Sequence, residues 1–205
     1  TPTDWAAPEV VAALEATGYN RAVFQAADAA ALIIEGLDWG DLTGLEALDF
    51  VYDTPAGRIV ISGTGPTAHD ETESPLILVD LGGDDLYRGP IGAVNQLARP
   101  FAVAIDLGGS DSYGYVAADA APIPGLLPAD GAGRATATRT GNGETSLSDE
   151  ARQGAARGGV ALLYDLGPGT DSYTTLRMGQ GFGLAGVGVL VDGDGDATLA
   201  AEALS

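Results

Sequence analysis

The 205-residue sequence contains no cysteine, which excludes disulfide bonds, thiolate metal sites and cysteine nucleophiles. Lysine is also absent, so nine arginines stand against 29 Asp and Glu residues and the formal net charge is −20. Nucleic acid and anionic membrane surfaces need basic patches, and we expect neither as a partner. No apolar run reaches the roughly 18 residues of a membrane span, so we expect no membrane insertion. The excess of negative charge instead favours cations as binding partners.

Aromatic residues make up only 6% of the chain, whereas glycine occurs 31 times and 45% of the residues are hydrophobic. A core built on large aromatic rings is therefore not expected. The composition favours many tight turns and the packing of small side chains, as in a repeat structure.

A Gly/Asp turn follows an apolar segment at four places. The copies are "LVDLGGDDLY" (78–87), "AIDLGGSDSY" (104–113), "LYDLGPGTDSY" (163–173) and the more divergent "LVDGDGDATL" (190–199). Their leading aspartates are separated by 26, 59 and 27 residues. Glutamines at 96, 153 and 180 precede the next leading Asp by 10, 12 and 12 residues. The spacing predicts a unit of about 27 residues.

The repeat predicts a mainly β fold in three parts. Residues 1–48 are expected to form a helical N-terminal cap, with two helices within 8–36, and residues 49–75 a β-hairpin and an acidic linker. Residues 76–205 are expected to form a right-handed parallel β-solenoid (β-helix or β-roll), because their apolar runs suit strands buried on both faces. Residues 118–150 are either an inserted loop or a degenerate coil. An antiparallel sandwich is the alternative architecture.

Stacked coils place equivalent aspartates about 4.8 Å apart. Two like charges at ~5 Å repel by about 3 kcal/mol at an effective dielectric constant of 20, so columns of aspartates need counter-ions. Ca²⁺ fits best, since it takes six to eight oxygen ligands and Gly turns leave carbonyl groups available. The candidate ligands are Asp80, Asp84, Asp85, Asp106, Asp111, Asp165, Asp171, Asp192, Asp194 and Asp196.

Two alternatives need no bound ion. The aspartates can cap each turn by accepting backbone N–H bonds. Alternatively, the acidity reflects a scaffold from a salt-adapted organism. Turn capping explains the leading Asp of each turn but accounts less well for the second Asp, five or six residues later.

The segments "LGGDDLY" and "LGGSDSY" partly resemble the calcium-binding nonapeptide repeats of RTX proteins. This resemblance implies a calcium-binding β-roll in which Asp85, Asp111 and Asp171 match the Asp of the motif. Here Asp84 and Ser110 replace its middle Gly, and tyrosines occupy its apolar position. The combined "DLGGDDxY" and "QGxGxxG" units also resemble a group of bacterial secreted repeat proteins, which implies a secreted or cell-surface location.

We expect a structural or adhesion module that is not an enzyme. The single histidine, His69, lies in the acidic linker and is interpreted as solvated, and no G-x-S-x-G elbow occurs. The alternative is a carbohydrate-active β-helix, a polysaccharide lyase or hydrolase, but its active site would interrupt the repeat. Tyr87, Tyr113 and Tyr173 are expected to stack within the fold, with a surface carbohydrate site as the alternative. Glutamine ladders are expected to join coils, and self-association is expected through the solenoid ends.

Overall fold

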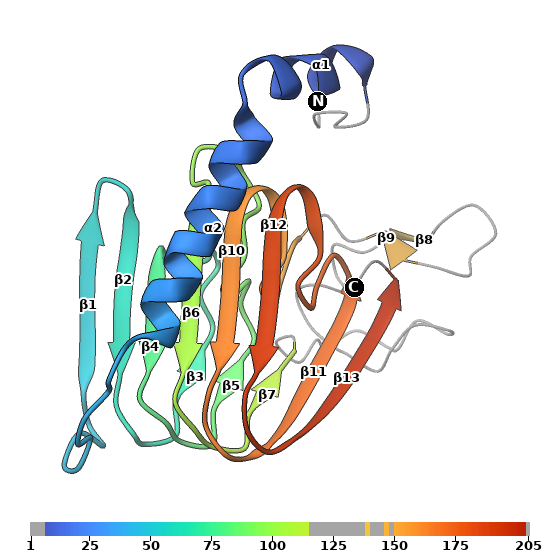
Figure 1. The fold of residues 1–205 in the computed structure, drawn as a ribbon. Coiled ribbons are helices and arrows are strands. Elements are labelled where there is room, and N and C mark those ends of the chain that lie inside the picture. The colour runs from blue at the N-terminus through green and yellow to red at the C-terminus, as the bar shows by residue number, and fades with distance from the viewer. Residues whose placement is uncertain (1–6, 115–137, 140–145, 148–149, 204–205) are drawn as a thin grey trace.

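The computed structural model describes residues 7–114, 138–139, 146–147 and 150–203, which form two helices and two main sheets (Figure 1). The helices are α1 (Pro8–Ala16) and α2 (Tyr19–Glu35). The larger sheet has the order β1 (Asp49–Thr54), β2 (Gly57–Ser62), β4 (Ile77–Asp80), β6 (Phe101–Asp106), β10 (Ala156–Asp165) and β12 (Gly183–Asp192). The smaller has the order β13 (Asp196–Ala203), β11 (Thr170–Arg177), β7 (Ser112–Tyr113), β5 (Leu86–Tyr87) and β3 (Ala68–His69). The short strands β8 (Thr138–Arg139) and β9 (Ser146–Leu147) pair separately.

From β2 onward, successive strands of the two main sheets alternate between them. Pairs within each sheet are parallel, apart from the antiparallel β1–β2 hairpin. Because side chains alternate along a strand, each strand of the larger sheet sends one set of side chains toward the smaller sheet and the other set outward. Leu78 and Leu163, for example, pack with Tyr87 between the sheets.

Helix α2 covers the outward face of the larger sheet (Figure 1). Its buried residues Val23, Ala27 and Ile34 lie on one side of the helix, as their spacing predicts. They pack with apolar side chains of β6 and β10, including Val103 and Leu162. The molecule therefore has three layers: one helix, a six-stranded sheet and a five-stranded sheet.

The prediction of a right-handed parallel β-solenoid with an N-terminal cap is wrong. The described residues form a mixed α/β arrangement of two sheets and two helices, whose main strands range from two to ten residues in length. Helix α2 does not close an end of the sheets, because its apolar side packs on the apolar outer face of β10 and β12. The helices and the hairpin themselves occur where they were expected.

The Gly-Gly pairs allow the turns after β4 and β6 to stack closely. Gly83 donates its N–H to the carbonyl of Gly108 at 2.7 Å. Gly109 has a φ of 143°, and a Cβ there would overlap the carbonyl oxygen of Gly83. Only glycine fits this conformation and this close approach. The glycines therefore set the spacing of the aspartates that flank them.

Most of the segment 118–150, predicted as a loop or a degenerate coil, lies outside the described residues. Among the residues that are described, no helix has the length and apolar character needed to cross a membrane.

Candidate metal centre

The leading aspartates of the four repeats form one row across the larger sheet. Parallel pairing places Asp80 beside Asp106, Asp106 beside Asp165, and Asp165 beside Asp192. Each is the last residue of its strand, and the first three are at most 2% exposed. They lie on the side of the sheet that carries Leu78 and Leu163, so the carboxylates enter the space between the two sheets.

A second row comes from the turns that lead into the smaller sheet. Asp85, Asp111 and Asp171 are each 1–2% exposed. The Oδ1 atom of Asp111 accepts the N–H of Asp85 at 2.6 Å, and Oδ1 of Asp171 accepts the N–H of Asp111 at 2.8 Å. Oδ1 of Asp85 in turn accepts the N–H of Thr67. In all three, the buried Oδ2 atom has no hydrogen-bond partner.

The two rows meet in three clusters of carboxylates. Within each cluster, one oxygen from each of three aspartates lies within 4.8 Å of the other two. The clusters are Asp80/Asp85/Asp106 (cluster I), Asp106/Asp111/Asp165 (cluster II) and Asp165/Asp171/Asp192 (cluster III). Asp106 and Asp165 each belong to two clusters, so the seven aspartates form one continuous row, called here the aspartate row.

A stack of four rings runs beside the aspartate row. The ring centres of His69, Tyr87, Tyr113 and Tyr173 are separated in turn by 4.7, 4.3 and 4.6 Å. The interior aromatic stack predicted for the tyrosines is therefore confirmed, and it also contains a histidine.

The tyrosine hydroxyls donate to the leading aspartates. The Tyr87 hydroxyl donates to Asp106, and the Tyr113 hydroxyl donates to Asp165 at 3.1 Å. Tyr173 contacts Asp165 at 2.8 Å and Asp192 at 2.9 Å. Burial is the largest cause that raises the pKa of each of the three hydroxyls, and the charges of neighbouring aspartates add to it, after that of Tyr87 in the case of Tyr113, so the hydroxyls remain protonated donors.

His69 closes the row at the β3 end. The interpretation of His69 as a solvated linker residue is wrong, because the side chain is 2% exposed. Its Nε2 lies 2.8 Å from Asp80 Oδ2, and its Nδ1 lies 3.3 Å from Glu71 Oε1. Burial opposes protonation of the ring, but the contacts with Asp80 and Glu71 prevail and raise the pKa of His69 to about 9. His69 is therefore an imidazolium at neutral pH.

We expect His69→Phe to destabilise the protein by about 3–5 kcal/mol, because the ring stack is kept while Asp80 loses its buried cationic partner. The matched control is Arg58→Ala, which removes the exposed 2.8 Å ion pair with Asp53 and is expected to change the stability far less, because solvent screens that pair. Urea unfolding of the calcium-free protein at neutral pH measures both losses. Equal losses for the two variants would contradict the assigned role of His69.

Burial raises the pKa of most carboxyls in the aspartate row. The pKa reaches about 6 for Asp85 and Asp165, about 7 for Asp111 and about 8 for Asp106. Neighbouring aspartates add to the effect in each case, whereas hydrogen bonds from backbone N–H groups or tyrosine hydroxyls oppose it. The pKa of Asp171 is also raised, again chiefly by burial. The seven carboxyl groups of the row are therefore not all ionised at neutral pH unless a cation binds among them.

Protons or metal ions can supply that charge, and the clusters can hold a metal ion. Their ligand atoms are all carboxylate oxygens, which favour hard cations such as Ca²⁺, Mg²⁺ or Mn²⁺ over softer transition metals.

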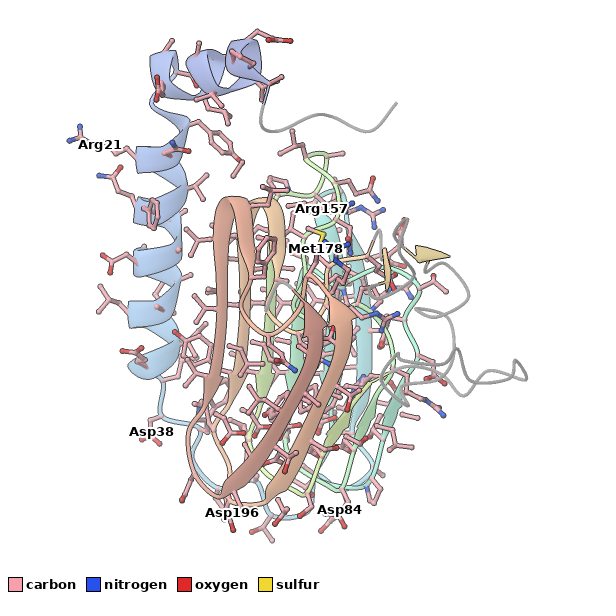
Figure 2. The ribbon with its side chains drawn as sticks, turned by 90° about the vertical axis from the view of Figure 1, so that its right-hand side faces the viewer. Arg21, Asp38, Asp84, Arg157, Met178 and Asp196 are labelled. Carbon is pink, nitrogen blue, oxygen red and sulfur yellow. The ribbon has the colours of Figure 1, made fainter. Side chains whose placement is uncertain are left out.

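The other predicted ligands, Asp84, Asp194 and Asp196, are exposed and belong to none of the clusters found in the described part of the chain. Figure 2 shows Asp84 and Asp196 at the rim formed by the turns. Oδ1 of Asp84 accepts the N–H of Ser110 at 3.0 Å, as an ion-free turn residue would. The adjacent residues Asp84 and Asp85 thus differ completely in environment.

The residues in register immediately next to the two ends of the aspartate row carry no carboxylate. At one end, Ser62 pairs with Asp80, and His69 pairs with Tyr87. At the other end, Ala197 pairs with Asp171, and Leu199 pairs with Tyr173. The row is therefore a bounded feature of the interior.

Two of the three predicted glutamines link neighbouring strands. Gln153 Nε2 donates to the carbonyls of Tyr113 and Thr174, and Gln180 Nε2 donates to those of Tyr173 and Ala200. Gln96 is exposed, so its inclusion in the ladder was wrong. The Val94–Ala156 bridge aligns Ile91, not Gln96, with Gln153. The sequence already distinguished Gln96 from the other two glutamines, because it precedes the next leading Asp by 10 residues, whereas Gln153 and Gln180 precede theirs by 12.

Comparisons with family models, curated proteins and solved structures gave no match.

Proposed function

We propose that the protein is a calcium-stabilised structural module in which each of the three carboxylate clusters binds one Ca²⁺. The buried, unpartnered Oδ2 atoms of Asp85, Asp111 and Asp171 carry this proposal. Each belongs to a residue of a different cluster, and an unpaired carboxylate oxygen excluded from water is costly. A bound cation in every cluster removes that cost at each position.

The chemistry of the ligands favours calcium among the hard cations. Mg²⁺ usually keeps several water molecules and needs near-ideal octahedral geometry, whereas Ca²⁺ accepts irregular sets of oxygens and bidentate carboxylates. Six of the seven aspartates are at most 2% exposed, which leaves little access for a hydrated ion. Three divalent cations and the His69 imidazolium carry seven positive charges, which equals the negative charge of the seven aspartates.

The repetition of the clusters supports a structural role rather than a catalytic one. The same arrangement of two aspartates and a tyrosine recurs along the row, whereas an active site is a single local departure from a repeat. Asp106 and Asp111, in the middle cluster, are 1–2% exposed, so a polysaccharide does not reach them. A row of cations that ties each strand to the next is what a scaffold requires.

We place this module outside the cell, in a secreted or cell-surface protein with a structural or adhesive role. Extracellular calcium modules work with dissociation constants of about 10⁻⁴–10⁻³ M, which match free calcium in that environment. A net charge of −20 favours cations and disfavours nucleic acid and anionic membranes as partners.

Terbium luminescence and calorimetry test the proposal. Tb³⁺ substitutes for Ca²⁺, and the stacked tyrosines lie beside the clusters, so excitation of tyrosine is expected to sensitise Tb³⁺ emission that Ca²⁺ then displaces. Calorimetry is expected to give three calcium ions per chain. Asp111→Asn, which alters only cluster II, is expected to reduce this number to two, while the exposed control Asp194→Asn keeps three. If metal-free protein shows neither emission with Tb³⁺ nor binding heat with Ca²⁺, and protein refolded with excess calcium retains no calcium after gel filtration, the proposal is refuted.

A further inference from the structure

The two main sheets end together at β12 and β13. Among the described residues, β12 pairs only with β10, and β13 pairs only with β11. These two strands lie at the same side of the molecule in Figure 1 and have ten and eight residues, respectively. Each leaves one side of its backbone without a strand partner in the described part of the chain. This pair of edges is called here the open end.

Along most of β12, the open end lacks the charged residues and prolines by which proteins usually protect strand edges, whereas β13 carries Asp196 and Glu202. Residues 183–191 contain no charged residue and no proline. Long uncharged edge strands of this kind pair readily with another strand. Between the two edges, Leu190 packs against the core between the sheets, and Leu199, which is in register with Tyr173, is 51% exposed. An apolar surface flanked by two strand edges thus reaches the solvent.

The opposite end of the sheets has a different shape. There the larger sheet continues to β1, whereas the smaller sheet stops at β3, which is level with β2. The step leaves a hollow of about 520 Å³, lined by residues that include Val51, Val60 and His69. At the open end the two sheets stop at the same level, whereas at the opposite end the larger sheet extends one strand further. The two ends therefore do not match in shape, and head-to-tail stacking of molecules is not expected.

We propose that the open end binds a second copy of this chain in a two-fold dimer, with β12 antiparallel to its copy and β13 antiparallel to its copy. A partner that pairs with both strands must present two strand edges separated by the same distance as β12 and β13. The open end of a second copy meets this condition because it has the same structure. A two-fold interface uses the same surface twice and closes on itself, so the assembly stops at two chains.

Charge fits the antiparallel arrangement. At one end of both strands, the exposed Asp194 lies in the turn that connects β12 to β13, and the exposed Asp196 is the first residue of β13. Antiparallel pairing opposes this end of β12 to the uncharged Gly183 end of the partner's β12, whereas it opposes the Asp196 end of β13 to the end of the partner's β13 that carries Glu202. The acidic rims of the two molecules therefore lie far apart, and salt is expected to strengthen the dimer by screening the remaining repulsion.

Leu199 offers a sharp test because its backbone N–H points to the free side of β13. The Asp196 N–H bonds to Gly169 of the neighbouring turn, and in a parallel ladder the direction alternates, so residues 197, 199 and 201 point outward. Leu199→Pro therefore blocks the edge without removing a hydrogen bond within the chain. Leu199→Gln removes the apolar contact and leaves the edge free. Leu97, 49% exposed, provides the control Leu97→Gln.

Sedimentation velocity over a concentration series of the full chain, with folding verified by circular dichroism, measures the association. We expect a monomer–dimer equilibrium for the wild type and for Leu97→Gln, and dimers at least about tenfold weaker for both Leu199 variants. A wild type that stays monomeric at every concentration would overturn the proposal, as would unchanged dimers in a folded Leu199 variant. Growth into open-ended assemblies would contradict the two-fold arrangement.

Discussion

Calcium is expected to raise the melting temperature of the protein well above the effect of monovalent salt at equal ionic strength. A ligand at a hundredfold excess over its dissociation constant stabilises the folded state by about 2.7 kcal/mol per site. For a chain of this length, one occupied site corresponds to an increase of roughly 5–10 °C, and further sites add to it. Differential scanning calorimetry with calcium, with EDTA and with matched sodium chloride measures the effect.

Asp106→Asn is the most informative variant in this experiment. Asp106 is shared by clusters I and II, so its loss removes a ligand from two sites. We expect it to abolish most of the increase caused by calcium. The matched control is Asp84→Asn, since Asp84 is an exposed aspartate of the same repeat unit outside the clusters. It is expected to retain the full increase.

The ion-free alternative predicts that calcium raises the melting temperature of neither the wild type nor Asp106→Asn, and that the substitution itself changes stability little. The pKa of Asp106 is raised to about 8, so without a cation this carboxyl is largely protonated at neutral pH. A neutral asparagine then replaces a neutral acid at little cost. If the melting temperature of the wild type is the same with EDTA and with calcium, protons neutralise the row and the calcium proposal fails.

Without calcium, the protein is expected to lose stability as pH rises from about 4 to about 9. Carboxyls whose pKa is higher in the folded state bind protons that the unfolded chain has already released, so they favour folding below their folded pKa. That contribution disappears between about pH 4 and pH 8, since the folded pKa is about 6 for Asp85 and Asp165, about 7 for Asp111 and about 8 for Asp106.

His69 contributes with the same sign over a higher pH range. Its pKa is raised from 6.5 to about 9, so the stability it provides is complete below pH 6.5 and disappears as pH rises through 9. Each group that is protonated only in the folded state adds a slope of about 1.4 kcal/mol per pH unit. Urea unfolding in EDTA at a series of pH values measures the total.

Calcium is expected to reverse the slope between pH 5 and pH 8, because the cations bind ionised carboxylates and compete with protons. In EDTA, Asp106→Asn is expected to flatten the slope, since it removes the carboxyl with the highest raised pKa in the row. A calcium-free protein that becomes more stable toward pH 8 would show that the aspartate row is ionised in the folded state without help from protons or metal ions.

The local pattern of the sequence was sufficient to predict several parts of the fold. The spacing of apolar residues and the Pro and Gly boundaries located both helices, and the "TPAG" turn located the hairpin. The spacing of the repeats predicted which residues lie side by side, and the register of Asp80 with Asp106 and of Asp165 with Asp192 follows it. These features depend on short-range geometry, which the sequence encodes directly.

The arrangement of the layers was not predictable in the same way. Helix α2 lies on the larger sheet because the apolar surface of β10 and β12 is available there, and that surface forms only when these strands pair. The expected solenoid failed for this reason: spacing in sequence predicts neighbours within a sheet but does not predict which elements cover its faces.

The sequence by itself determined that aspartates would line up in rows, since equal spacing and Gly-Gly turns impose a common register on parallel strands. Only the tertiary structure decided which aspartates are buried. Asp84 and Asp85 are adjacent and chemically identical, but Asp84 is exposed, whereas Asp85 is buried. Folding likewise turned His69 from a linker residue into a buried cation, because burial beside Asp80 and Glu71 depends on strands that meet only in the folded protein.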